Sequence, residues 1–354
     1  MAFEVDFLPV GDGERSGDAI CVRFGNLQGD RNQQTICVID GGTKESGRKL
    51  VEHVRLYYNT DRVDHVFCTH PDSDHASGLC EVLESLSCGT LVMHRPWEHS
   101  EDICHLFDDP KLTPDKLAGR MERNLFAAHN LEKLAHQKNI PIIEPFAGTA
   151  NDDKSIVVLG PSKDYYQSLL PTFRDMPELA EEPSIVQKIG QFVETAIKWV
   201  AETMNIETLV DPPSNEVSSE NNSSAIILFQ IDGKKLLLTG DAGTDALSRA
   251  IQFAASQGIS VENVRFFQVP HHGSRRNIGP TILNQIKPET AFISVAAEGA
   301  PKHPSKRVTN ALVRRGATVY VTQGNGLLHS YPHTRANWGP APVVPFYNQV
   351  EDFG

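Results

Sequence analysis

Apolar and polar positions alternate along the first hundred residues in the way that is typical of strands interleaved with helices. Three β-like runs lie at residues 3–9, 19–24 and 34–40, and a segment with apolar positions at helical spacing follows at 50–58. The next segments predict a strand at 63–69, a helix at 78–86 and a strand at 91–94. This order of elements predicts an α/β fold.

Residues 100–220 have a more helical pattern. Thr113 and Pro114 suit the N-cap and first position of a helix, whose apolar residues from Leu117 to Leu131 share one face. Strands are predicted at 140–144 and 156–160, and a second helix at about 178–204. We interpret 100–220 as a helical insertion that covers a cleft as a lid. An inert insertion or an oligomer contact explains the pattern equally well.

The rest of the chain returns to short apolar runs. Strands are predicted at 225–230, 235–239, 264–269, 291–295 and 317–322, and a helix between 302 and 315. Residues 331–354 are rich in proline and predict a C-terminal tail on the surface. Because 354 residues are within the range of one α/β sandwich, we expect a single domain, 1–354, that contains the insertion.

Composition narrows the class of protein. A net charge of -12 and a pI near 5.6 argue against a surface coated with basic residues for non-specific nucleic-acid binding. The six cysteines include no C-x-x-C pair, which fits reduced thiols in the cytosol. No apolar run is long enough to span a bilayer, and the first residues are acidic where a signal peptide is basic. We expect a soluble, cytoplasmic protein that does not bind membranes.

The candidate chemistry is concentrated in one hexapeptide, His70-Pro71-Asp72-Ser73-Asp74-His75, directly after a predicted strand. Two histidines and two aspartates this close would repel and desolvate one another unless a cation lay between them. His70 and Asp72 can point to one side of the loop while Asp74 and His75 point to the other, which suits two neighbouring divalent ions. A polar turn with helix caps is the alternative.

The same stretch, THPDSDHASGL, resembles the metallo-β-lactamase signature His-x-His-x-Asp-His, with Asp72 in place of the second histidine. Three further segments resemble that fold in the expected order: VIDGG at 38–42, LTGD at 238–241 and VPHHGS at 269–274. Within this fold the chain is most similar to the hydrolase domain of the ComEC/Rec2 competence proteins, which share a later His-Pro, here His303-Pro304. The resemblance covers about residues 1–90 and 220–330, and it implies an αββα four-layer sandwich.

The resemblance also implies two divalent metal ions bridged by one carboxylate. The first ion would be held by His70, Asp72, Asn222 and the bridging Asp241, and the second by Asp74, His75, Asp241 and His271. Asn222 stands where most members of the fold have a histidine. Because oxygen ligands make the first site harder, we expect Mn²⁺ to support activity at least as well as Zn²⁺.

Other residues near these motifs are predicted to support the site. The resemblance implies that Asp40 hydrogen-bonds a ligand histidine, whereas Asp18 is either a second supporting group or an ordinary turn residue. Catalytic roles are predicted for Asp74, His303, His272 and Lys302. The residues predicted to bind substrate are Ser274, Arg275, Arg276, His94 and Thr322. Solvated loop charges are the alternative for the arginines, and a satisfied loop histidine is the alternative for His94.

These motifs together predict a two-metal hydrolase that cuts phosphodiester bonds, with DNA as the expected substrate. A hydroxide that bridges the ions would attack phosphorus in line, and the cations Arg275, Arg276, Lys302, Lys306 and Arg307 would contact the nucleic acid. Because a cytosolic nuclease endangers its host, we expect restraint by the lid or by a regulatory partner, as in anti-phage defence. A homo-oligomer is the alternative to a regulatory partner. Two alternatives stay open: a hydrolase of lactones, thioesters or cyclic nucleotides, and a metal-binding interaction module without activity.

Overall fold

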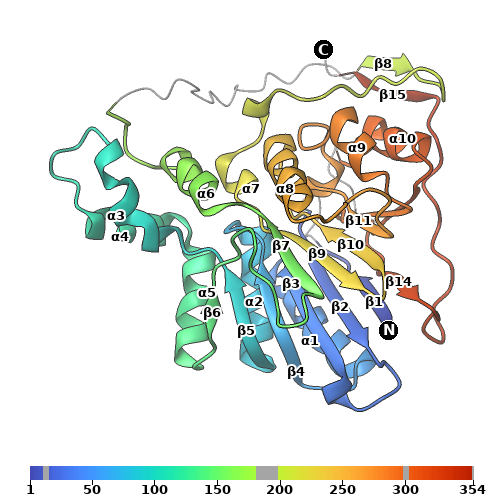
Figure 1. The fold of residues 1–354 in the computed structure, drawn as a ribbon, viewed down its shortest axis with the longest axis horizontal. Coiled ribbons are helices and arrows are strands. Elements are labelled where there is room, and N and C mark those ends of the chain that lie inside the picture. The colour runs from blue at the N-terminus through green and yellow to red at the C-terminus, as the bar shows by residue number, and fades with distance from the viewer. Residues whose placement is uncertain (11–15, 181–197, 298–302, 353–354) are drawn as a thin grey trace.

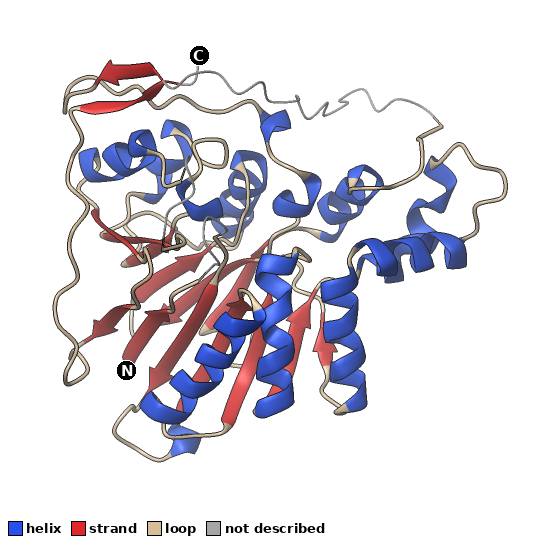
Figure 2. Ribbon diagram, turned by 180° about the vertical axis from the view of Figure 1, so that it is seen from behind, coloured by secondary structure: helices blue, strands red, loops and turns tan. Residues whose placement is uncertain are grey.

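The computed structural model describes residues 1–10, 16–180, 198–297 and 303–352. Two sheets lie face to face, and helices cover the outer face of each sheet (Figure 1). Viewed from behind, several helices lie across the strands of one sheet (Figure 2). The chain therefore has the expected αββα layers.

The first sheet has seven strands, and the second has six. In spatial order the first sheet contains β14 (Leu327–Tyr331), β1 (Ala2–Phe7), β2 (Ala19–Gly25), β3 (Gln34–Gly41), β4 (Arg62–Cys68), β5 (Ser87–Met93) and β6 (Ile142–Ile143). The second contains β13 (Thr318–Val321), β12 (Thr290–Ile293), β11 (Phe266–Gln268), β10 (Lys234–Leu238), β9 (Ile226–Ile231) and β7 (Ile156–Gly160). Strands β3 to β6 are parallel, as are β10 to β13, so their carboxyl ends meet at common edges.

Ten α-helices occur in the described ranges. They are α1 (Lys44–Tyr57), α2 (Ser73–Ser85), α3 (Ser100–Ile103), α4 (Pro114–Asn124), α5 (Phe126–Gln137), α6 (Lys163–Leu169), α7 (Ser219–Asn222), α8 (Thr244–Ser256), α9 (Pro280–Ile286) and α10 (Lys306–Arg314). Helices α8, α9 and α10 lie over the second sheet, and α3 and α4 project from one end of the sandwich (Figure 1). None of the helices in these ranges has the length and apolar character needed to traverse a bilayer.

Strand alternation explains how the two sheets meet. In β1, Phe3, Val5 and Phe7 point into a core shared with Phe229 of β9 and Phe266 of β11. Residues of the opposite parity point toward the helices, where buried Asp6 accepts a hydrogen bond from Tyr58 at 2.6 Å. A second core fills the space between the sheets and their helices.

Close backbone contacts bring α1 and α2 against the end of β3. A side chain on Gly41 would overlap the backbone of Gly78 and Leu79, and a side chain on Gly78 would overlap that of Gly41. Only glycine permits this approach. It sets the start of α2 beside Asp40, and this is how the hexapeptide comes to lie against the β3 end.

The predicted insertion is more closely integrated than its helical pattern indicated. Helix α5 packs on α2, β6 joins the first sheet and β7 joins the second. The predicted single helix after Thr113 is two helices, because Leu125 leaves the helical conformation at φ -107° and ψ 41°. The division into a core, a 100–220 insertion and a 331–354 tail stays a prediction.

The helix predicted at 178–204 can be compared with the structure only at 178–180 and 198–204, and neither part is helical. Residues 181–197 lie outside the described part, and 198–201 form strand β8. Strand β8 (Lys198–Ala201) pairs antiparallel with β15 (Gln349–Asp352) from the predicted tail. Cross-strand pairing with a distant segment thus outweighs the local helical pattern.

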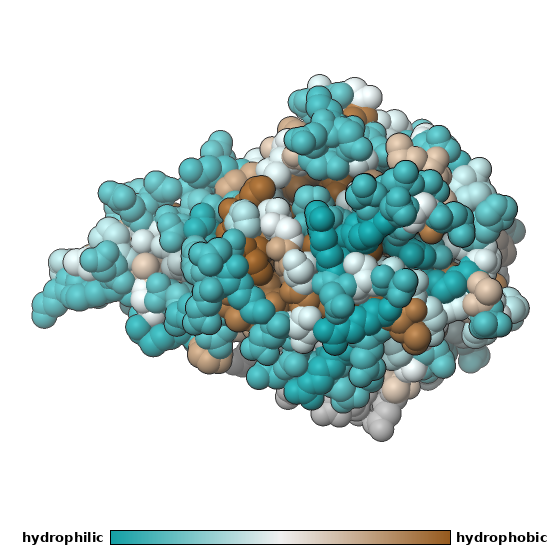
Figure 3. Space-filling view, turned by 90° about the horizontal axis from the view of Figure 1, so that it is seen from below, coloured by the Kyte–Doolittle hydropathy of each residue, from teal (hydrophilic) through white to brown (hydrophobic). Residues whose placement is uncertain are grey.

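One edge of the sandwich is open. A pocket of about 520 Å³ between β4, β5 and β7 is lined by residues that include Phe67, Val92 and Ile156. The face shown in Figure 3 is largely hydrophilic, and hydrophobic atoms lie in hollows between its ridges.

Candidate metal centre

The hexapeptide and the other predicted ligands come together where strands of both sheets end. His70 follows β4, His75 lies in the first turn of α2, Asp241 follows β10 and His271 follows β11. Each of these strands has its carboxyl end at this edge, which is where loops of α/β sheets place functional side chains. Segments far apart in sequence therefore supply one cluster.

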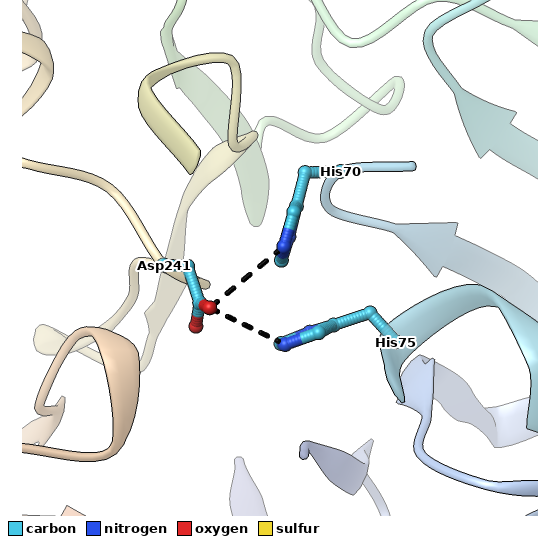
Figure 4. Close-up of side chains that lie close together, drawn as sticks. All are labelled: His70, His75 and Asp241. Atoms are coloured by element: carbon cyan, nitrogen blue, oxygen red, sulfur yellow. Dashed lines mark ion pairs between the residues drawn. The ribbon is translucent and has the colours of Figure 1, made fainter. Parts of the chain in front are cut away.

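Asp241 lies at the centre of this cluster (Figure 4). Its Oδ2 atom is 3.8 Å from His70 Nε2 and 3.6 Å from His75 Nε2. It is also 3.7 Å from His271 Nε2. His70 and His75 are buried, whereas the side chain of His271 is 33% exposed, so the cluster reaches solvent on the His271 side.

One buried carboxylate, Asp40, orients both histidines of the hexapeptide. His75 Nδ1–H donates to Asp40 Oδ2 at 2.8 Å. The Thr69 hydroxyl donates to the same oxygen at 2.7 Å, so it is free to accept from His70 Nδ1 at 3.1 Å. In both rings Nδ1 is engaged by these partners, so Nε2 is the nitrogen that faces the cluster. Metal-ligating histidines usually have this arrangement.

Asn277 fixes the opposite side of the cluster. His271 Nδ1–H donates to Asn277 Oδ1 at 2.8 Å, and Asn277 Nδ2 donates to the carbonyl of Asp241 at 2.8 Å. His271 and His272 both have left-handed backbone angles, with φ 46° and φ 55°. Non-glycine residues in this region are strained, and the surrounding contacts maintain the loop conformation that aims both rings inward.

His272, predicted to have a catalytic role, lies inside the cluster. Its Nδ1–H donates to the carbonyl of Ser294 at 3.0 Å, and its buried Nε2 lies with Asp74 and His75 in a group whose ligand atoms are within 4.8 Å of one another. A second such group contains His272, Asp18 and Asp241. His272 and Asp18 are thus both within reach of a shared ion, and their roles stay predictions.

Burial and charge act together on the ionisable groups. Burial alone would raise the pKa of Asp241, but the histidines around it hold that pKa well below its usual range. Burial would lower the pKa of His75, yet Asp241 and Asp40 raise it well above the usual value. Burial raises the pKa of Asp18 to about 8; His75 opposes this rise, and Asp241 and Asp40 assist it. Without a metal ion, the raised pKa values of Asp18 and His75 favour protons on these two groups, and these protons offset negative charge of the carboxylates.

The donor set fits divalent cations. Among the residues that the structure describes, the buried Nε2 atoms of His70, His75 and His272 and the Oδ1 atom of Asp241 find no hydrogen-bond partner. Unsatisfied buried polar atoms are rare because each costs free energy, and here they converge on common points. Imidazole nitrogen and carboxylate oxygen are ligands for Zn²⁺ and Mn²⁺. The site therefore suits divalent metal ions.

Two predicted ligands of the first ion have other contacts. Asp72 lies 3.8 Å from His70 Nε2, but its carboxylate also contacts the guanidinium of Arg174. Asn222 Nδ2 donates to the carbonyl of Val217 at 3.4 Å, and its Oδ1 lies against Gly243. The buried Oδ1 atom of Asn222 has no hydrogen-bond partner among the described residues, and ligation by Asn222 stays a prediction. The Nδ2 atom of its neighbour Asn221 is 3.5 Å from His271 Nδ1.

Thr322 and His94, both predicted to bind substrate, have contacts within the chain, and substrate binding by them stays a prediction. The Thr322 hydroxyl donates to the carbonyl of Val295 at 2.8 Å and accepts from its N–H at 2.7 Å, so it fixes two strand ends. His94 is buried and stacks on Tyr166, with ring centroids 4.1 Å apart. Tyr166 comes from α6, and a pattern within β5 could not reveal that it covers His94.

The loop after His272 is organised by its own serine. Buried Ser274 accepts from the backbone N–H of Arg276 at 3.3 Å. Burial lowers the pKa of Arg276. Ser274 therefore shapes the loop, while substrate binding by Arg275 and Arg276 stays a prediction.

His303 lies beside the cluster, with its ring 5.7 Å from that of His271. Burial, assisted by His271 and His272, lowers its pKa to about 3, so the ring is neutral near pH 7 and has no extra proton to deliver. The prediction for Lys302 lies outside the described residues.

Two of the predicted nucleic-acid cations have internal partners. Arg307 Nη2 is 2.9 Å from Asp352, and Lys306 Nζ lies over the rings of Trp199 and Tyr347. The carboxylate of Glu351 binds the first turn of α10, accepting from the N–H of Lys306 at 3.2 Å. A carboxylate of the chain itself thus occupies the N-terminus of α10, where the backbone N–H groups of a helix commonly bind anions.

Sequence reasoning missed four residues that hold the site together. They are Asn277, Gln268, Arg174 and Glu220. Gln268 Nε2 donates to Asp18 at 2.5 Å, and its Oε1 accepts from the N–H of Thr239 at 2.9 Å. Gln268 could have been found from the sequence, because it lies near the end of the strand predicted at 264–269. A glutamine buried there requires hydrogen-bond partners.

Comparison with known proteins agrees with this fold and site. Residues 31–121 match the family model of the metallo-beta-lactamase superfamily, and this match lies in the part of the chain that contains the hexapeptide. The sequence is 28% identical to ComE operon protein 3 of Bacillus subtilis (strain 168) over 140 residues, 40% of this chain and 17% of that protein. It is 34% identical to Recombination protein 2 of Haemophilus influenzae (strain ATCC 51907 / DSM 11121 / KW20 / Rd) over 115 residues, 32% of this chain and 14% of that protein. The chain thus spans less than a fifth of either relative, and the predicted resemblance to the competence proteins is confirmed.

Three solved structures are similar over most of the chain. Zn(2+)-bound PqqB from Methylobacterium extorquens has 11% identity and a TM-score of 0.45, with 92% of this chain and 99% of that chain covered. A diphosphatase from the PhnP family has 9% identity and a TM-score of 0.41, with 93% and 99% covered. Tm1679, a metal-dependent hydrolase of the beta-lactamase superfamily, has 11% identity and a TM-score of 0.43, with 92% and 98% covered.

Proposed function

We propose that this chain is a two-metal phosphodiesterase that acts on DNA. The observation that supports it most strongly is the convergence of three histidine Nε2 atoms on Asp241 Oδ2, at 3.6–3.8 Å. His70, Asp72, His271 and Asp241 would hold one ion, and Asp74, His75, His272 and Asp241 the other, with Asp18 beside the second. In this proposal His271 belongs to the first ion in place of Asn222, and His272 takes its place at the second ion. Each set then has two imidazole nitrogens and two carboxylates, which are donors that both Mn²⁺ and Zn²⁺ accept.

The residues of the chain supply positions for each part of the reaction. Divalent cations held there would polarise a phosphoryl oxygen and acidify a water molecule, so no serine, cysteine or threonine nucleophile is needed. Asp40 keeps the Nδ1 protons of His70 and His75 away from the cluster through the contacts described above. His303, neutral near pH 7, is proposed to donate a hydrogen bond to the leaving oxygen.

Support for DNA is separate from support for the metal centre. It comes from the sequence similarity to Recombination protein 2. Arg174, from the 100–220 insertion, contacts Asp72 in the cluster. We therefore include in the proposal that the insertion, or a partner protein, restrains the activity.

A hydrolase of small phosphodiesters, such as cyclic nucleotides, is the second candidate. Two observations favour it: Arg307 and Lys306 are engaged within the chain, and the net charge is -12. A small substrate does not need an extended basic surface.

A metal-by-substrate panel tests both candidates. The purified protein would be incubated with Mn²⁺, Zn²⁺ or Mg²⁺ and with single- and double-stranded DNA, RNA, a cyclic nucleotide, a lactone and a thioester. We expect Mn²⁺-dependent DNA cleavage that Asp74→Ala abolishes. Asp245→Ala, on the exposed face of α8, is the matched control and should keep activity. Intact DNA and RNA with hydrolysis of the cyclic nucleotide would replace the first candidate by the second.

A further inference from the structure

Arg174, which follows α6 in the 100–220 segment, reaches the metal centre. Its guanidinium Nη2 contacts the carboxylate of Asp72. Its Nε lies 3.3 Å from Glu220 Oε1, and its backbone N–H donates to the same oxygen at 2.6 Å. Glu220 belongs to α7 and is buried. A carboxylate fixed in the core thus directs this arginine toward a predicted ligand.

The backbone around Arg174 is anchored on several sides. Thr172 Oγ1 lies 2.6 Å from Ser219 Oγ of α7. Arg120 Nε donates to the carbonyl of Asp175 at 2.6 Å, and Asn124 Nδ2 donates to that of Arg174 at 3.4 Å. The side chain of Arg174 is nevertheless 47% exposed. A fixed backbone with a half-exposed guanidinium is suited to binding something that enters from solvent.

The chemistry of the group indicates what it binds. A guanidinium has five N–H donors, and in the described part of the chain its polar partners are the two carboxylates of Asp72 and Glu220. Its planar fork matches the oxygens of a phosphate or phosphodiester. Asp72 lies 3.8 Å from His70 Nε2, so the guanidinium and a cation near His70 would compete for one carboxylate.

We propose that Arg174 is the positioning residue for the anionic group of the substrate. In the metal-free site it neutralises Asp72, and once a cation takes that carboxylate the guanidinium binds a phosphodiester oxygen. The assignment of a phosphodiester rests on the proposed function. The competition with metal rests on the contacts of Arg174 alone.

Competition with metal and binding of the phosphodiester predict opposite effects of one substitution: metal should bind more tightly and substrate more weakly. In Arg174→Ala, Mn²⁺ affinity of the metal-free protein, measured by titration calorimetry, should rise roughly tenfold because a competing charged hydrogen bond is removed. With bis(4-nitrophenyl) phosphate, KM should rise roughly tenfold while kcat changes less than about threefold, since ground-state binding is lost. Arg174→Lys should be intermediate. Arg120→Ala, which loosens the same loop without reaching Asp72, should change neither value.

Each outcome decides the proposal. Unchanged Mn²⁺ affinity and unchanged KM in Arg174→Ala would overturn it, and so would a loss of metal affinity that Arg120→Ala reproduces, because that result indicates loop unfolding. If the wild type hydrolyses no phosphodiester, the proposed function fails, and binding of inorganic phosphate decides Arg174 separately. Tighter Mn²⁺ binding with loss of phosphate binding in Arg174→Ala would support the assignment, and retained phosphate binding would refute it.

Discussion

Replacing Asp40 by asparagine changes the one group that orients both histidines of the hexapeptide. The carboxylate is buried and accepts three hydrogen bonds: from the Thr69 N–H at 2.8 Å, from the Thr69 hydroxyl at 2.7 Å and from His75 Nδ1 at 2.8 Å. Asparagine has nearly the same shape, but it has one acceptor oxygen and no charge. At least one histidine should therefore lose its fixed orientation.

The expected size follows from these contacts. Loss of a partner behind a metal-ligating histidine costs roughly 10–100-fold in metal affinity, or about 1.4–2.7 kcal/mol. Hydrogen bonds to a charged group contribute about 1.5–3 kcal/mol each, so the free energy of unfolding of the metal-free protein should fall by roughly 2–4 kcal/mol.

Titration calorimetry with Zn²⁺ and Mn²⁺, together with urea unfolding of the metal-free protein, measures both effects. Asp64→Asn is the matched control, because Asp64 also accepts from a backbone N–H, that of Ile36 at 2.8 Å, and from Arg31 at 2.7 Å, away from the cluster. It should lower stability and leave metal affinity unchanged. If Asp40→Asn binds both metals as tightly as the wild type does, orientation by Asp40 is refuted.

Two further predictions concern stability. Zn²⁺ or Mn²⁺ at 100 times its Kd should raise the free energy of unfolding by about 2.7 kcal/mol per site, and a chelator should remove this gain; a melting temperature that metals do not change would contradict the site. Burial would raise the pKa of Asp6, but His53 and Arg335 lower it from 3.8 to about 2. A depressed carboxyl pKa stabilises the fold above about pH 4 and loses that effect as pH falls toward 2, so from pH 7 to pH 2 the wild type should lose about 2 kcal/mol more than Asp6→Asn; equal losses in urea unfolding would exclude this linkage.

The sequence was most informative where the chemistry is local. Six consecutive residues contain two histidines and two aspartates, so their spacing alone indicated a metal-binding loop. Strand alternation likewise predicted β1, β2 and β3 to within two residues at each end, because each strand has one face in the core between the sheets. Asp40 was placed correctly against His75 because it ends a strand beside that loop.

The residues that sequence reasoning missed act across long distances in the chain. Arg174 meets Asp72 only because α6 and α7 are held side by side, and Gln268 meets Asp18 across 250 positions. The stacking of His94 on Tyr166 was not predicted, because Tyr166 comes from another segment. Strand β8 has a helical pattern but pairs with the last strand of the chain. Periodicity within a segment contains no information about such partners.

The central claim is that side chains from both sheets hold two cations through Asp241. The most direct test is the number of Mn²⁺ or Zn²⁺ ions bound per chain, measured by elemental analysis after equilibrium dialysis of the wild type and of Asp241→Asn. The account predicts two ions in the wild type and at most one in the variant. A single ion in the wild type, or a count that the substitution leaves unchanged, would contradict it.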